Sequence, residues 1–128
     1  MERSIEILAV IQFGVIGLSH IVQHRAWAEF FIWLRSKGHA GVFINGFLSL
    51  GAGSFIVAFH RVWTGIPLLL TVIGILNLVK ATHSFLWPAL SMRSMNRVSL
   101  ERSREFAAAG LILIAMAGVL LFHLLRAA

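Results

Sequence analysis

Hydrophobic residues fill four long segments of this chain, and shorter polar segments separate them. The apolar segments cover about residues 5–23, 39–59, 65–87 and 106–125. At about 1.5 Å per residue, each is long enough as an α-helix to cross most of the roughly 30 Å hydrocarbon core of a bilayer. The pattern predicts an all-α integral membrane protein, a four-helix transmembrane bundle folded as one domain over residues 1–128.

The polar segment after the first span has a helical pattern of its own. Wound as a helix, residues 25–38 place their large aromatic side chains on one side and Arg25, Glu29 and Ser36 on another. This arrangement is typical of a helix that lies in the membrane interface. We therefore expect a short interfacial amphipathic helix between spans 1 and 2, ended by Gly38.

Small residues indicate how the spans pack. Ser49 and Gly53 are four residues apart in the second span, a spacing that lets two helices approach closely. The link to the third span is only about five residues long, so spans 2 and 3 should be antiparallel neighbours. In the fourth span, a second smooth face is expected, made of Gly110, Ile114, Ala117, Gly118 and Leu121. No internal repeat is evident in the sequence.

Polar residues inside the apolar segments gather along one face of the third span. Asn77, Lys80, His83, Ser84 and Trp87 fall within an arc of about 120° on a helix. A charged side chain at mid-bilayer costs roughly 2.5–3.5 kcal/mol on insertion scales, so Lys80 is either functional or extends to the lipid headgroups. With Gln12 across the bundle, these residues are expected to form a polar intramembrane stripe that contacts a partner, a lipid or an ion.

Composition agrees with a membrane location. Hydrophobic residues make up 59% of the chain and charged residues 12%, with a mean hydropathy of +0.87. Water-soluble domains are less apolar and more highly charged. The chain has no cysteine, which excludes disulfides, thiolate metal sites and thiol catalysis. Its net charge of +6 does not indicate nucleic-acid binding, because the basic residues lie beside apolar spans.

The basic residues predict an orientation. Seven lie in the segments that follow spans 1 and 3, namely Arg25, Arg35, Lys37, Arg93, Arg97, Arg102 and Arg104. The opposite side has three, Arg3, Arg61 and Arg126. By the positive-inside rule, both termini face outward and the two longer loops are cytoplasmic, in what we expect to be a bacterial inner membrane.

The second loop is a candidate contact surface and also carries a helix-start signal. Its arginines Arg93, Arg97, Arg102 and Arg104 are candidates for contact with anionic lipid or an acidic partner. Ser99, two residues before Glu101, is a candidate N-terminal cap for the fourth helix.

Histidines are the most numerous residues with ligand chemistry. This orientation places His20, His24, His39 and His83 toward the cytoplasmic side, and His20 and His24 are one helical turn apart. Such a set could bind a metal, or a b-type haem held by two histidines on facing helices. The alternative is that these histidines bind no metal or haem and only form hydrogen bonds between helices or at the interface.

Three functions therefore remain open. The sequence contains no motif for nucleophilic catalysis and no pair of acids inside a span, so we favour a non-enzymatic role. In this interpretation the protein is an accessory subunit of a larger membrane complex or a small homo-oligomer. The alternatives are a redox protein with a histidine-bound haem or metal, and a small ion channel or transporter built around Asn77 and Lys80.

Overall fold

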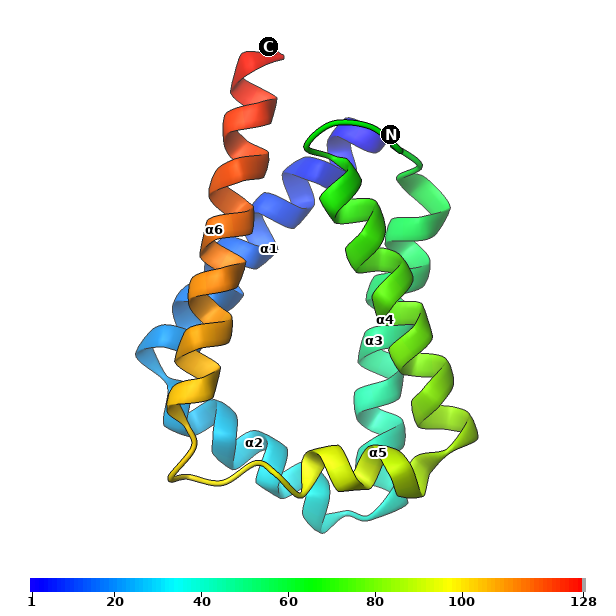
Figure 1. Ribbon diagram of the computed structural model, residues 1–128, viewed down its shortest axis with the longest axis vertical. Helices are drawn as coiled ribbons and strands as arrows, with labels where there is room; N and C mark the ends of the chain where they lie inside the picture. The colour runs from blue at the N-terminus through cyan, green and yellow to red at the C-terminus, as the bar shows by residue number, and fades with distance from the viewer. Residues whose placement is uncertain (128) are drawn as a thin grey trace.

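The computed structural model describes residues 1–127, and every regular element in that range is a helix (Figure 1). The helices are α1 (Glu2–Val22), α2 (His24–Ser36), α3 (His39–Phe59), α4 (Leu68–Leu86), α5 (Pro88–Met95) and α6 (Arg104–Arg126). Four of them, α1, α3, α4 and α6, are long and apolar enough to cross a membrane.

The predicted helices are confirmed, including the short helix between spans 1 and 2. The short helix α2 forms where an interfacial helix was expected, and Gly38 follows it with a φ of 62° that favours glycine. Two features near the second loop differ from the prediction. The first is helix α5, which was not predicted. Pro88 begins it, at a position where the missing N–H costs no hydrogen bond. The expectation for Ser99 is wrong, because its hydroxyl accepts from the Arg102 N–H in a turn before α6.

The long helices associate as two antiparallel pairs. Helix α1 packs along α6, and α3 packs along α4, whereas the two pairs contact each other mainly at their ends. Figure 1 shows the pairs on opposite sides of the molecule, joined at one end by α2 and α5. The predicted neighbourhood of spans 2 and 3 is confirmed. The four spans form a helical bundle whose buried residues lie in two separate clusters and not in one central core.

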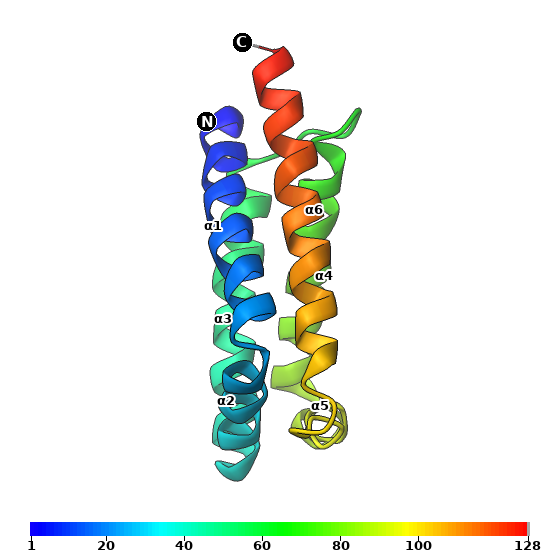
Figure 2. The ribbon, with the colours of Figure 1, turned by 90° about the vertical axis from the view of Figure 1, so that its left-hand side faces the viewer.

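The chain order contains a repeat that the sequence pattern did not reveal. The order long helix, short helix, long helix occurs twice, as α1–α2–α3 and as α4–α5–α6. Figure 2 shows each triplet as one layer, so each pair takes one helix from each half of the chain. Two histidine pairs share one spacing, since 83 − 20 and 123 − 60 are both 63. The halves are therefore related by an approximate two-fold axis along the molecule.

Each end of the molecule has its own small hydrophobic core. At the end with the termini, Ile5 and Ala9 of α1 meet Leu70 of α4 and Leu120 of α6. At the other end, Leu34 of α2, Val42 of α3 and Met95 of α5 form a second cluster, with four partly buried aromatic and methionine side chains around it: Phe30, Phe31, Phe43 and Met92. The two clusters hold the helix pairs together at both ends.

Glycines allow the close approach within each pair. A Cβ atom at Gly17 would lie 2.9 Å from the Gly110 carbonyl oxygen, and one at Gly53 would lie 2.8 Å from the Gly74 carbonyl oxygen. The predicted small-residue face of span 2 is thus used inside the protein. The predicted face of span 4 is partly wrong, because a Cβ at Gly118 would meet nothing within 4 Å. Leu120 and Leu124 are buried in its place.

The outer surface of the long helices is apolar. Large hydrophobic side chains such as Val15 (66% exposed), Leu76 (60%), Leu111 (61%) and Phe122 (55%) face outward. So extensive an apolar surface on four parallel and antiparallel helices requires lipid or another protein to cover it.

Candidate functional site

Two cavities lie between the helix pairs and follow one another along α3 and α4. The cavity near α2 and α5 has a volume of about 300 Å³, and the cavity nearer the termini has about 430 Å³. Asn77 borders the second cavity, and Lys80, one helical turn away, borders the first. The predicted polar stripe of span 3 thus faces the space between the pairs.

The first cavity has a polar wall. Lys80, His83 and Ser84 enter it from α4, and the other polar lining residues are Asn45, Ser91 and Ser94. Phe31 of α2 and Phe106 of α6 also line it. The described lining contains no acidic residue, so the only formal charge on it is that of Lys80.

The second cavity is mostly apolar. Gln12 of α1 and Asn77 of α4 both line it, among aliphatic and aromatic side chains of α1, α3 and α4. The Asn77 amide donates to the Ile73 carbonyl, 2.9 Å away. The structure thus brings Gln12 and Asn77 to one cavity and Lys80 and Ser84 to the other.

Lys80 has no acidic partner in the part of the chain that the structure describes. The one close contact between an acidic and a basic side chain found among residues 1–127 joins Glu6 and His60, at the opposite end of the molecule. The predicted contact arginines, Arg93, Arg97, Arg102 and Arg104, are all exposed. They therefore add positive charge near the Lys80 cavity without neutralising it.

Arg35 holds the second loop in place. In the sequence it counted only toward the predicted orientation. Its guanidinium donates to the carbonyl oxygens of Met95 (3.2 Å), Asn96 (3.3 Å) and Val98 (2.7 Å). Carbonyls at a helix C-terminus carry partial negative charge and lack intrahelical donors, so a cation is favourable there. This contact fixes α5, and with it Ser91 and Ser94, against α2.

The histidines predicted to bind a cofactor lie at the α2 and α5 end but in separate environments. His20 lies in the last turn of α1, and His24 begins α2 after a break at Gln23, so their expected placement on one continuous helix is wrong. His39 is exposed at the start of α3. Within residues 1–127, no group of three or more His, Asp or Glu side chains is arranged to hold a metal.

Three of these histidines have their Nδ1 atoms hydrogen-bonded. His20 donates to the Ile16 carbonyl (2.8 Å), His24 pairs with the Ser103 hydroxyl (2.8 Å) and His83 with the Ser91 hydroxyl (2.9 Å).

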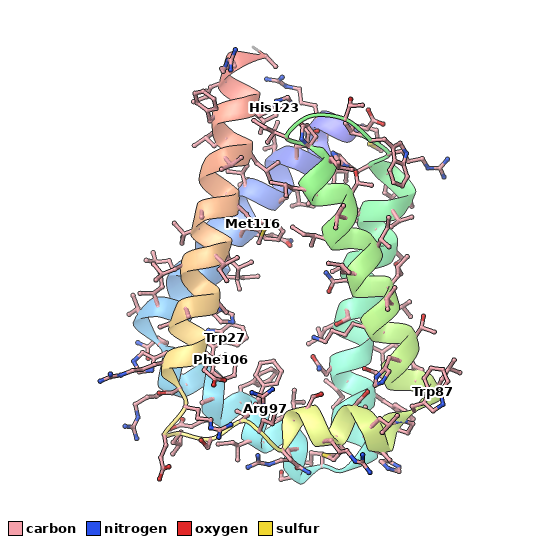
Figure 3. All side chains as sticks on the ribbon, viewed as in Figure 1. Trp27, Trp87, Arg97, Phe106, Met116 and His123 are labelled. Carbon is pink, nitrogen blue, oxygen red and sulfur yellow. The ribbon has the colours of Figure 1, made fainter. Side chains whose placement is uncertain are left out.

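His20 also lies among aromatic rings at the α2 end of the first helix pair. Its ring stacks on Trp27 with 4.1 Å between centroids and has its centroid 6.1 Å from that of Phe106. Figure 3 labels Trp27 and Phe106 at this end of the molecule. Binding of haem b or a metal by His20, His24, His39 or His83 stays a prediction.

A buried polar cluster at the other end joins the two helix pairs. His60, fully buried at the end of α3, lies 2.9 Å from Glu6 of α1 through Nε2 and 2.9 Å from Thr71 of α4 through Nδ1. The Thr71 hydroxyl donates to the Val62 carbonyl at 2.7 Å. We call these residues, Glu6, His60 and Thr71, the Glu6–His60–Thr71 cluster.

The hydrogen bonds of this cluster determine where its protons lie. The single Thr71 hydroxyl proton points to Val62, so His60 Nδ1 must carry a proton and donate it to Thr71. The Nε2 contact with Glu6 then needs one proton between the two atoms. The pair therefore shares one proton, as imidazolium and carboxylate or as two neutral groups.

Sequence reasoning gave this cluster little weight. Neither Glu6 nor His60 is among the site residues predicted from the sequence. One signal was available: Glu6 is the only acid inside the first apolar segment, and an acid there needs a partner. Comparisons with protein-family models, curated proteins and solved structures find no match to this chain.

Proposed function

We propose that this is a non-enzymatic integral membrane protein that binds a lipid-like molecule between its two helix pairs. The observation that carries the proposal is the two adjoining cavities between helices whose outer surface is apolar. The first cavity has a polar wall, and the second is mostly apolar. Cavities of roughly 300–1,000 Å³ with few polar groups are typical small-molecule sites.

Membrane insertion is supported by four helices of sufficient length and hydropathy. Both termini and the segment between α3 and α4 lie at one end, and α2 and α5 lie at the other (Figure 1). With the charge bias, we propose that α2, α5 and the basic loop face the cytoplasm of a bacterial inner membrane. A homo-oligomer or a larger complex remains part of the proposal, because the outward faces can bind protein as well as lipid.

A cavity-filling substitution tests the binding site. Gly51 lines the second cavity, and a Cβ there would meet nothing within 4 Å, so Gly51→Leu fills the cavity without a backbone clash. We expect the wild-type protein, solubilised in a mild non-ionic detergent, to retain bound lipid in native mass spectrometry. Gly51→Leu should lose it. The same spectra report the oligomeric state.

Gly118→Leu is the matched control. It makes the same change in another long helix, at a glycine that also has open space around it but lines none of the described cavities. Wild type and Gly118→Leu should retain the same bound mass. If wild type carries no lipid, or if both variants lose it equally, the proposed site is wrong.

A further inference from the structure

We infer that the ligand is an anionic amphiphile, whose phosphate or carboxylate head binds Lys80 while its hydrocarbon chain enters the second cavity. This inference rests on the proposed function and names the ligand of the same site. Two features of the first cavity lead to it: an unneutralised cation and a set of free hydrogen-bond donors.

The charge argument begins with the surroundings of Lys80. The side chain projects from a helix expected to lie in the membrane, and no described acidic group pairs with it. A charge in so apolar a setting is costly unless an opposite charge accompanies it. Since the described cavity wall supplies no carboxylate, a bound anion is the natural counter-charge. The exposed arginines of the nearby loop attract anions to this end of the molecule.

The neighbouring polar groups suit an anion as well. Asn45 and Ser94 line the cavity and form no side-chain hydrogen bond with any residue from 1 to 127, so both can donate to a bound group. Ser84 is occupied, because its hydroxyl donates to the Lys80 carbonyl at 3.0 Å. Lys80, Asn45 and Ser94 thus offer three donors from α4, α3 and α5 to an oxygen-bearing anion.

The position of the cavity indicates an amphiphile. Lys80 lies six residues before the last residue of α4, or about 9 Å along the helix from its end, a depth from which a long lysine side chain can extend to the headgroup region. One turn further into the helix, Asn77 borders the second, mostly apolar cavity. A head held at Lys80 would therefore direct its chain toward the apolar cavity and the middle of the bilayer.

Binding of four probes to the 128-residue protein in non-ionic detergent tests this inference. Oleyl phosphate and oleate carry an anionic head, oleyl alcohol has the same chain with a neutral head, and inorganic phosphate has no chain. The two anionic amphiphiles should bind roughly tenfold or more tightly than oleyl alcohol, as expected for a charge-assisted contact. Inorganic phosphate should not displace them at equal concentration.

Two lysine variants and one matched control accompany the probes. Lys80→Gln should abolish the preference for anionic heads, so that the three oleyl compounds bind about equally. Lys80→Arg keeps the charge and should keep the preference, which separates loss of charge from loss of folding. Lys37→Gln is the control, because Lys37 follows α2, lies over the Trp33 ring and lines none of the described cavities.

The outcomes separate this inference from the proposed function. Equal binding of all three oleyl compounds, or an intact preference in Lys80→Gln, overturns the anionic head. If oleyl alcohol binding is still lost in Gly51→Leu, the proposed lipid site stands. Displacement of oleyl phosphate by inorganic phosphate at equal concentration identifies a free-anion site and overturns the amphiphile. Binding of none of the probes contradicts both proposals.

Discussion

At the scale of single residues, the Glu6–His60–Thr71 cluster shows how a polar group is accommodated in an apolar protein. Glu6 is only 5% exposed and His60 is fully buried, yet every buried side-chain nitrogen and oxygen among residues 1–127 has a hydrogen-bond partner. An unpaired buried polar group is costly, whereas a paired one costs little. The cluster is therefore a specific connection between α1 and the α3–α4 pair.

Glu6→Ala should destabilise the protein by about 1–3 kcal/mol, because it leaves His60 Nε2 buried without a partner. Glu6→Gln should cost less, since its amide can still hydrogen-bond to Nε2. Glu2→Ala, at an exposed residue one turn earlier in α1, is the control and should change stability little. Unfolding followed by circular dichroism in detergent measures all three. Equal stability of Glu6→Ala and wild type would show that the cluster does not join the helix pairs in the folded protein.

At the scale of helices, glycine contacts determine which helices pair. Gly53 faces backbone atoms of α4, with 2.8 Å from a Cβ there to both the Gly74 carbonyl oxygen and the Leu78 nitrogen. Backbone atoms cannot move aside as a flexible side chain can. A larger residue at this position must therefore push α3 and α4 apart at this contact.

Gly53→Ala should therefore destabilise the protein by about 1–3 kcal/mol, the usual cost of overpacking. Gly118→Ala is the matched control, because its Cβ meets nothing within 4 Å. It should stabilise α6 slightly, by about 0.5–1 kcal/mol, since alanine is the better helix former. Thermal unfolding in the same detergent compares the two. Equal effects would mean that α3 and α4 are not in close contact.

At the scale of the whole molecule, the two-fold arrangement makes each helix pair depend on both halves of the chain. Each helix pair combines both halves of the chain, so neither half alone contains a complete pair. Because both triplets begin at the same end, the two short helices α2 and α5 meet at the other end (Figure 1). The site is not symmetric, however, since the residue 63 positions before Lys80 is Gly17, which packs on α6.

The absence of cysteine makes the proposed orientation simple to measure. Single cysteines at Thr64, before α4, and at Asn96, after α5, are exposed and lie at opposite ends of the molecule. In intact spheroplasts, a membrane-impermeant maleimide should label Thr64→Cys. Asn96→Cys should react only after the membrane is permeabilised. The cysteine-free parent should not react. The reverse pattern would invert the proposed orientation, and labelling of both sites in intact cells would contradict membrane insertion.

The sequence by itself determined the helices and little of their arrangement. Hydropathy and length located α1, α3, α4 and α6, and aromatic periodicity located α2, because these signals are local and repeat every few residues. The short link predicted that α3 and α4 are neighbours. Helix α5 was missed because it has only eight residues, with Arg93 near its end, and it is stabilised by the packing of Met95 on Leu34.

Only the tertiary structure decided which polar residues meet. Glu6 and His60 are 54 residues apart, and no local pattern in the sequence predicts that the start of α1 contacts the end of α3. The stripe of α4 was visible in the sequence, yet its division between two cavities depends on how far the helix pairs separate. The physical reason is that helix formation depends on residues close together in the sequence. Helix pairing depends on backbone contacts between residues far apart in the sequence.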